Sequence, residues 1–101
     1  MNIAKMMQQA QRLQADMQAT QEQLANKTVE ASVGGGKVNV TATGTGEVVA
    51  IKIDRAVVDP EDVEFLEELV LKGVQDAIAK GKEMAAEEMK KVTGGMNIPG
   101  I

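Results

Sequence analysis

A heptad seam runs along the first quarter of the chain, with positions that recur at alternating intervals of three and four. The seam consists of Ile3, Met6, Ala10, Leu13, Met17, Thr20 and Leu24. This spacing is typical of helices that pack nearly parallel over several turns. The opposite face is rich in Gln, and so polar a helix with so narrow a seam is not stable in isolation. The pattern predicts a helix over residues 2–26 that needs a partner helix.

The hydrophobic period then changes to two over residues 28–53. Apolar residues alternate with polar ones in the runs 29–33 and 38–43, and the third run, 48–53, places Val49, Ile51 and Ile53 on one face. Glycines at 34–36 and at 44 and 46 separate the runs. Short alternating runs joined by glycine turns predict a three-stranded antiparallel meander. Such a sheet has one apolar face to cover and two edges to protect.

A second helix is predicted over residues 60–92. Asp59 is the expected cap, and Pro60 suits a first helical turn. The apolar stripe consists of Leu66, Leu69, Val70, Val74, Ala77, Ile78, Met84, Ala85, Met89 and Val92. Gly73 and Gly81 lie on or beside this stripe, which indicates close backbone approach or a local bend. Residues 93–101 are expected to be a mobile tail, so the fold class is α+β in one domain, 1–101.

Composition narrows the function classes. The 101 residues include no Cys and no His, and Phe65 is the one aromatic residue. Disulfides, thiolate chemistry and the commonest metal ligands are therefore excluded. The sequence also shows no set of residues that would form the catalytic site of an enzyme. We expect no cofactor, no metal and no small-molecule substrate. Seven Met residues specify core packing weakly, which favours a homodimer with added interface area.

The sequence also lacks membrane and export signals. No apolar run approaches the roughly 18 residues of a membrane span, and the first ten residues lack a signal peptide's apolar stretch. We therefore expect a cytoplasmic protein.

Charge is unevenly distributed along the chain. The net charge is −4, from 11 basic and 15 acidic residues. Residues 59–76 hold seven carboxylates and one lysine, Lys72, whereas residues 1–27 and 77–92 each carry a small positive excess. The acidity is therefore concentrated at the start of the second helix, roughly 20 Å from its Lys90–Lys91 end.

Several strings in the chain match a known family. The matching strings are residues 7–11, 36–40, 51–54, 66–70, 75–77, 88–89, 93–96 and 99–100. In this order they resemble the YbaB/EbfC family of bacterial nucleoid-associated proteins over almost the whole chain, although helix formers are more usual in that family at Gly73 and Gly81. The resemblance implies a tweezer-shaped homodimer with central sheets and projecting helical arms. It also implies a nucleoid protein that binds double-stranded DNA with limited sequence preference, alters DNA conformation, and contributes to nucleoid organisation, DNA protection and gene regulation.

Five basic side chains are the candidate DNA contacts. They are Lys5, Arg12, Lys82, Lys90 and Lys91. If the two helices pack antiparallel, Lys5 is expected to approach the Lys90–Lys91 end. Because no clustered set of base-reading side chains is visible, we expect little base readout.

An ordinary solvated helix face is the alternative explanation for several of these side chains. A carboxylate precedes a lysine by four residues in three places, the arrangement that stabilises helices. The pairs are Glu68 with Lys72, Asp76 with Lys80, and Glu87 with Lys91, and Asp16 follows Arg12 by four. Lys5 and Lys82 have no preceding carboxylate, so this alternative explains them least.

Two other motifs are set aside, and one other function remains open. The string Gly34–Lys37 lacks the Walker spacing, so it predicts a hairpin turn rather than a phosphate loop. The carboxylates of residues 59–64 lack the ligand spacing of a calcium loop, and the start of a helix explains them. The alternative function is a non-catalytic adaptor that presents its Gln-rich helix and acidic patch to other proteins.

Overall fold

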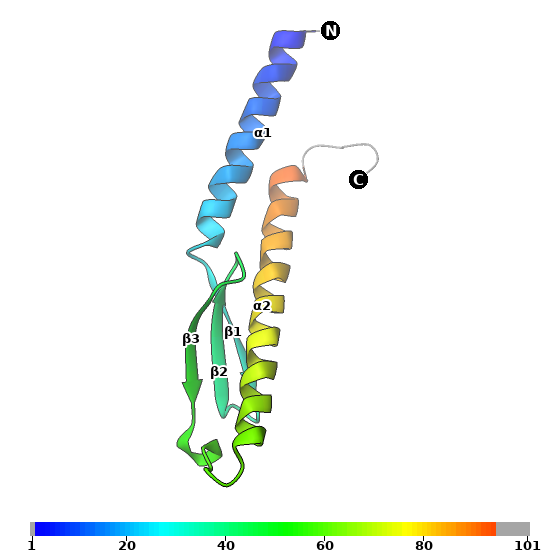
Figure 1. Cartoon of the computed structure of the whole chain (residues 1–101). Helices are drawn as coiled ribbons and strands as arrows, with labels where there is room; N and C mark the ends of the chain where they lie inside the picture. Colours follow the sequence, from blue (N-terminus) through cyan, green and yellow to red (C-terminus); the bar gives the residue numbers. More distant parts are fainter. Residues whose placement is uncertain (1, 95–101) are drawn as a thin grey trace.

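A computed structural model describes residues 2–94 of the chain and confirms the predicted order of helix, three strands and helix. The elements are α1 (Ile3–Leu24), β1 (Thr28–Val33), β2 (Val38–Thr43), β3 (Val48–Ile53), a short 3-10 helix η1 (Arg55–Val57) and α2 (Val63–Thr93). The molecule is elongated, with extents of 71 × 25 × 16 Å (Figure 1). Neither α1 nor α2 is long and apolar enough to cross a membrane. The expected tail falls largely on residues 95–101, outside the described part.

The three strands form one antiparallel sheet in the order β1-β2-β3. Three glycines with positive φ, Gly34, Gly35 and Gly36, form the first turn, as predicted. The sequence pattern was wrong at Val49. Ala42 pairs with Val48 and Thr41 with Ala50, so Val49 is the extra residue of a bulge. Val48, rather than Val49, therefore shares the α2-facing side of β3 with Ile51 and Ile53.

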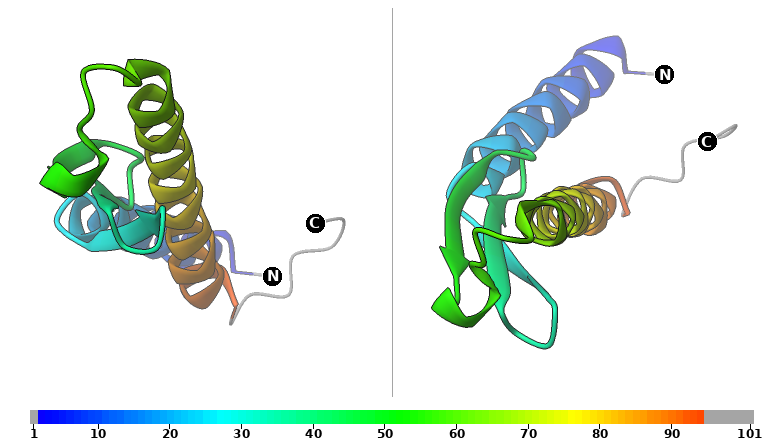
Figure 2. Two further views of the ribbon diagram at one scale, coloured as in Figure 1. Left: turned by 90° about the horizontal axis from the view of Figure 1, so that it is seen from below. Right: turned by 60° about the horizontal axis from the view of Figure 1, so that its bottom comes forward.

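α2 packs against one face of the sheet through a stripe of small residues (Figure 2). Gly73, Ala77 and Gly81 recur at every fourth position and are the buried residues of α2. A Cβ on Gly73 would lie 2.8 Å from Cγ2 of Val40, so the helix backbone approaches the sheet side chains very closely. Close approach, and not a break in the helix, is therefore the role of both glycines. The larger residues of the predicted stripe flank this contact and are half-buried.

The start of α2 corrects a second expectation. The helix begins at Val63 rather than residue 60, because Asp62 caps it by accepting a hydrogen bond from the Phe65 N–H at 3.3 Å. Asp59, the expected cap, instead accepts a hydrogen bond from the Glu61 N–H at 2.9 Å in the preceding turn. Asp59 and Asp62 are both suitable capping residues, and the helix starts at the second of them.

The seam of α1 packs against α2 only along its second half. Leu24 is 3% exposed and Leu13, Met17 and Thr20 are half-buried, whereas Ile3 at the other end is 70% exposed. α1 extends well past the C-terminal end of α2 (Figure 1). The predicted partner helix is thus α2, but it supports only the part of α1 next to the sheet.

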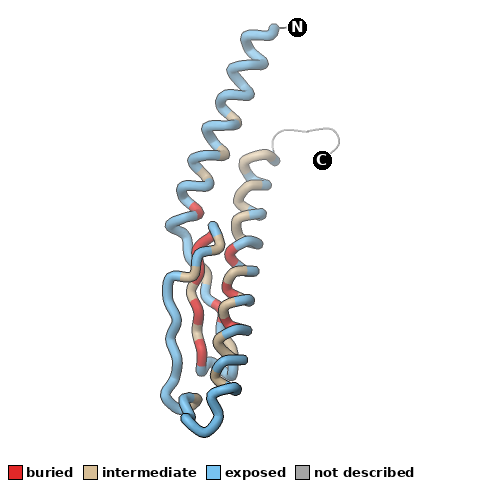
Figure 3. The backbone as a smooth tube through the Cα atoms, viewed as in Figure 1, coloured by how far each residue is buried: buried red, intermediate tan, exposed pale blue. Residues whose placement is uncertain are grey.

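The buried core is small and lies between β1, β2 and α2 (Figure 3). Its buried members are Ala31, Val38, Val40, Ala42 and Ala77. β3 is exposed along most of its length, because α2 lies over β1 and β2 and scarcely reaches β3. One strand of the sheet therefore has inward-facing apolar side chains without a cover from this chain.

We expect Gly73→Ala to lower the free energy of unfolding by about 1–2 kcal/mol. Overpacking typically costs about 1–3 kcal/mol, and a contact of 2.8 Å with the short side chain of Val40 places this site in the upper part of that range, at about 2–3 kcal/mol. The better helix propensity of Ala returns about 1 kcal/mol. Urea unfolding followed by circular dichroism measures the difference. Gln75→Ala, on the exposed side of the same helix turn, is the control and should change stability by less than about 0.5 kcal/mol. Equal stability of Gly73→Ala and wild type would contradict the close approach.

Candidate nucleic-acid interface

The outer half of α1 carries a cationic and amide-rich patch. Lys5, Gln8, Gln9 and Arg12 line a shallow hollow of about 190 Å³, and all four are exposed. Their spacing of three, four and seven residues places them on one face of the helix over two turns. The two cations are therefore about 10 Å apart along the axis, with amide donors between them. We call these four residues the α1 patch.

The second half of α2 carries the other three candidates. Within residues 2–94, the side chains of Lys82 and Lys90 make no ion pair or hydrogen bond. Lys82 lies beside the β2–β3 turn, where a Cβ on Gly46 would be 3.9 Å from its Cε. Lys91 differs, because its Nζ lies 3.3 Å from Oε1 of Glu88. Lys82, Lys90 and Lys91 form the α2 group.

Glu88 joins the base of α1 to the end of α2. Its Oε1 contacts Nζ of Lys91 and also lies 3.6 Å from Nζ of Lys27, the residue that precedes β1. The hydrogen bond from Lys91, with the positive charge of Lys27, holds the pKa of Glu88 below its usual value. Nothing in the sequence singles out Lys27, because its partner is 61 residues away and no helical spacing relates the two.

The expected meeting of Lys5 with the Lys90–Lys91 end is wrong. The helices are antiparallel, but Lys27 is the residue level with Glu88. Lys5 precedes Lys27 by 22 residues, most of them helical, so it lies about 30 Å farther along α1. The packing register of α1 on α2, set at Leu24, therefore gives two separate cationic groups in one subunit.

In all three of the expected carboxylate–lysine pairs of α2, the lysine has another partner. Lys72 pairs with Asp76 at 3.3 Å rather than with Glu68, and Lys91 pairs with Glu88 rather than Glu87. Lys80 likewise does not pair with Asp76. Its Nζ donates a hydrogen bond to the backbone oxygen of Glu30 at 3.2 Å, on the edge strand β1. A carbonyl on an edge strand lacks a strand neighbour, so a long lysine side chain can satisfy it.

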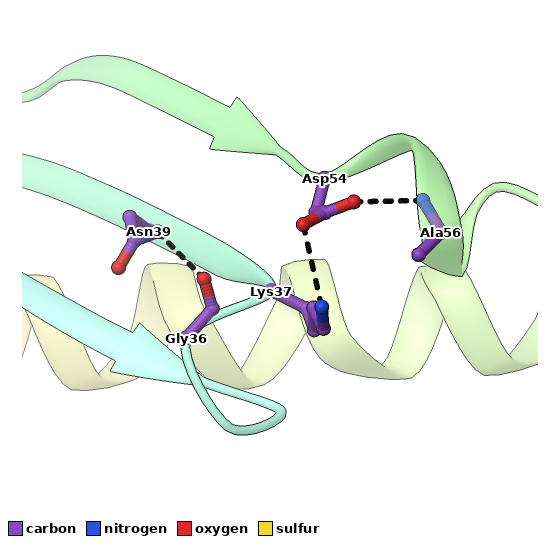
Figure 4. A network of polar contacts seen from close by, with 5 residues as sticks. All are labelled: Gly36, Lys37, Asn39, Asp54 and Ala56. Atoms are coloured by element: carbon purple, nitrogen blue, oxygen red, sulfur yellow. Dashed lines mark hydrogen bonds and ion pairs between the residues drawn. The ribbon is translucent and has the colours of Figure 1, made fainter.

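Another lysine, Lys37, forms an ion pair at the end of the sheet that lies next to η1 (Figure 4). Nζ of Lys37 lies 3.4 Å from Oδ2 of Asp54, while Oδ1 of Asp54 accepts a hydrogen bond from the Ala56 N–H at 2.8 Å. The Ala56 N–H, followed by Lys37, lowers the pKa of Asp54. This network connects the first turn to η1 and leaves Lys37 outside the candidate interface. Within residues 2–94 no group of three or more acidic, His or Cys residues is arranged to hold a metal ion.

Comparison with known proteins identifies the family. Residues 1–96 match the model of the YbaB/EbfC DNA-binding family. This chain belongs to that family. Its description is that of a DNA-binding family and not of an enzyme family.

Sequence relatives and a solved structure agree with this family. A nucleoid-associated protein of Syntrophobacter fumaroxidans is 55% identical over 95 residues, covering 94% of this chain and 86% of the relative. A nucleoid-associated protein of Akkermansia muciniphila is 54% identical over 99 residues, covering 98% and 95%. The crystal structure of an uncharacterized Helicobacter pylori protein shares the fold, with a TM-score of 0.69 at 22% identity, over 95% of this chain and 97% of the other.

We expect the pKa of Glu88 to lie below the usual glutamate value and to rise in Lys27→Met, because one of its two cations is lost. Carbon-detected NMR titration of the carboxyl group measures both. A depressed folded-state pKa stabilises the fold above the unfolded pKa of about 4.3, and this contribution disappears as the pH falls through the folded pKa. Glu22→Gln is the matched control and should leave the pKa of Glu88 unchanged. A Glu88 pKa at or above the usual value would contradict the ion pairs.

Proposed function

We propose that this protein is a non-catalytic, nucleoid-associated protein that binds duplex DNA as a homodimer and alters its conformation. The observation that carries the proposal is the position of the α1 patch and the α2 group, which both lie away from the acidic start of α2. Relatives named as nucleoid-associated proteins support a place in the bacterial nucleoid, in the cytoplasm. The proposal includes a role in nucleoid organisation, DNA protection and gene regulation.

Distance makes DNA binding compatible with the negative net charge. Glu64 and Lys90 lie at opposite ends of α2, about 40 Å apart at the rise of a helix. The Debye length at 0.1 M salt is about 10 Å, so the acidic end scarcely weakens the attraction of the cationic end for phosphates. The α1 patch lies still farther out, on the projecting part of α1 (Figure 1). A duplex at these ends therefore meets positive charge and amide donors.

The chemistry of the patch favours backbone contact over base readout. Lys and Arg bind phosphate oxygens, and Gln8 and Gln9 add hydrogen-bond donors between them. Lys5 and Arg12 lie at the two ends of the patch, about 10 Å apart along the first turns of α1, a spacing at which both can bind phosphates of one duplex. Limited sequence preference follows.

The homodimer is supported by the incomplete cover of the sheet. The accessible surface of the chain is 7508 Å², whereas a compact monomer of 10.7 kDa has about 5,500 Å². The radius of gyration, 19.5 Å, similarly exceeds the roughly 13 Å of a compact chain of this length. A second copy would cover part of this excess surface.

An apolar strip on α2 and β3 is the surface we assign to the second copy. A hollow of about 440 Å³ on α2 is lined by Leu66, Glu67, Val70, Leu71 and Val74. Leu71 is 58% exposed, and Ile51 and Ile53 of β3 are exposed on the α2-facing side of the sheet. A second copy offers the same uncovered strip, and two such strips buried together form a two-fold interface.

DNA binding is tested by fluorescence anisotropy with a duplex oligonucleotide at 50 and 300 mM salt. With four to six phosphate contacts per dimer, the affinity should fall by about three to four powers of ten between the two salt concentrations. Lys5→Glu/Arg12→Glu should weaken binding at 50 mM at least tenfold and flatten the salt dependence, because up to four phosphate contacts per dimer are lost. Lys82→Glu and Lys90→Glu/Lys91→Glu test the α2 group in the same way.

Lys72→Glu is the charge-matched control, because it reverses a lysine at the acidic end of α2. It should change the affinity much less than the same reversal at Lys5. If wild-type protein forms no salt-sensitive complex at micromolar dimer, DNA binding is refuted and the adaptor function is favoured. If the control weakens binding as much as the Lys5 and Arg12 reversals, the assignment of the contact surface is wrong.

The assigned dimer surface is tested by Leu71→Asp. In an isolated chain this substitution falls on a largely exposed side chain and should be harmless. In the dimer it places two charges in an apolar interface and should shift the mass, measured by sedimentation equilibrium, from about twice 10.7 kDa toward 10.7 kDa. Ala79→Asp adds the same charge at another exposed position of α2 and should leave the dimer intact. A monomeric wild type, or an intact dimer of Leu71→Asp, would contradict the assignment.

A further inference from the structure

The turn between β2 and β3 lies at the junction of the two helices. The Gly44 N–H donates to the backbone oxygens of Leu24 and Lys27, each at 3.0 Å, at the end of α1. On the other side, the backbone oxygen of Thr43 lies against Gly81 of α2. Thr43 and Gly44 are both buried. The pair therefore separates the base of α1 from the middle of α2.

Neither side of this contact leaves room for a methyl group. A Cβ on Gly44 would lie 2.8 Å from Cδ2 and 3.0 Å from the backbone oxygen of Leu24. A Cβ on Gly81 would overlap the Thr43 carbonyl oxygen. Neither glycine has a positive φ, so alanine at either position changes the packing and not the allowed backbone conformation. The spacing between the two helices is thus set by direct contact with the turn.

The turn itself is braced. The Thr43 hydroxyl accepts hydrogen bonds from the N–H groups of Thr45 at 3.3 Å and Glu47 at 3.2 Å, and lies 2.7 Å from the Thr45 hydroxyl. The Thr43 N–H donates to the backbone oxygen of Glu47 at 2.8 Å. The Thr43 backbone oxygen also accepts a hydrogen bond from the Gly46 N–H at 3.0 Å. A turn held by five hydrogen bonds moves as a unit when one of its neighbours is displaced.

We infer that Thr43 and Gly44 form a wedge that sets the direction of α1 relative to α2, with Gly44 as a positioning residue for the α1 patch. Two other contacts join the helices, the seam of α1 against α2 and the Lys27–Glu88 ion pair. The seam residues Leu13, Met17 and Thr20 are only half-buried, and partly exposed ion pairs contribute little. The wedge is the most deeply buried of these contacts, so we assign the angle to it.

A small change of this angle has a large effect at the α1 patch. Lys5 lies 19 residues from Leu24, a lever of about 28 Å. A tilt of about 10° then moves Lys5 by about 5 Å, more than the roughly 3.4 Å axial spacing of phosphates on one DNA strand. This consequence rests on the proposed DNA binding, whereas the wedge itself does not.

Pulsed electron paramagnetic resonance tests the wedge without DNA. The chain has no Cys, so two spin labels can be placed uniquely on full-length protein diluted with unlabelled copies. The pair Ala15→Cys/Ala86→Cys reports the distance from α1 to α2, and Ser32→Cys/Ala86→Cys reports the distance from the sheet to α2. Ala15 lies nine residues from Leu24, a lever of about 14 Å, so a tilt of about 10° in the Gly44→Ala background should change the first distance by about 2 Å. The second distance should stay within about 1 Å.

Two further variants make the test decisive. Glu47→Ala changes an exposed side chain of the same turn and should alter neither distance. If Gly44→Ala fails to fold, Leu24→Ala, which removes the side chain facing Gly44, should change or broaden the α1–α2 distance instead. Unchanged α1–α2 distances in the folded variants would overturn the inference.

DNA binding by the same variants separates this inference from the proposed function. Gly44→Ala should weaken duplex binding at least tenfold at 50 mM salt, with a smaller salt slope, while Glu47→Ala binds as wild type does. If the distance shifts and wild-type protein binds no DNA, the wedge stands and the proposed function fails. If the distance shifts and DNA binding is unchanged, the role of Gly44 in positioning the α1 patch is refuted.

Discussion

The close contact between α2 and the sheet determines the rest of this structure. Gly73, Ala77 and Gly81 bring the helix backbone onto β1 and β2, where Val38 and Val40 are the largest fully buried side chains. Such a contact excludes water with few side-chain atoms, so the buried core remains thin. The helix covers two strands and leaves the third, and the chain alone buries little apolar surface for its length. Packing of this kind leaves apolar surface exposed, which a partner subunit can cover.

The same contact separates the charges. Because α2 is long and continues past one end of the sheet, the carboxylates of its first turns lie far from its last lysines. From Leu24 toward its first residue, α1 extends beyond the C-terminal end of α2 (Figure 1). Its cations therefore lie far from every acidic residue in the first turns of α2. A net negative chain thereby presents two positive regions. Net charge alone is a poor guide to nucleic-acid binding when the molecule is 71 Å long.

Much of the fold could be predicted from local patterns. The heptad seam of α1, the period of two in the strands and the glycine turns each depend on neighbours within seven residues. The bulge at Val49 could not be predicted, because it depends on the register with β2. The start of α2 was predicted three residues early, because Asp59 and Asp62 are both good caps and the local pattern does not distinguish them. The glycine signal at 73 and 81 was informative, although it left a bend and a close approach equally open.

The candidate site was less predictable than the fold. Lys5 and Arg12 share a helix face, and their spacing alone places them together. The partners of Lys27 and Lys80 are 61 and 50 residues away, so no pattern along the chain reveals them. Long flexible side chains find acceptors across elements, and the resulting pairs depend on how the helices are aligned.

One chain is incompletely packed, and we propose that a second copy completes it. The most direct test is the thermal midpoint of unfolding measured over a hundredfold range of protein concentration. A dimer whose folding and association are coupled must show a midpoint that rises with concentration. A midpoint that stays constant, together with the mass of a single chain at every concentration, would contradict the account.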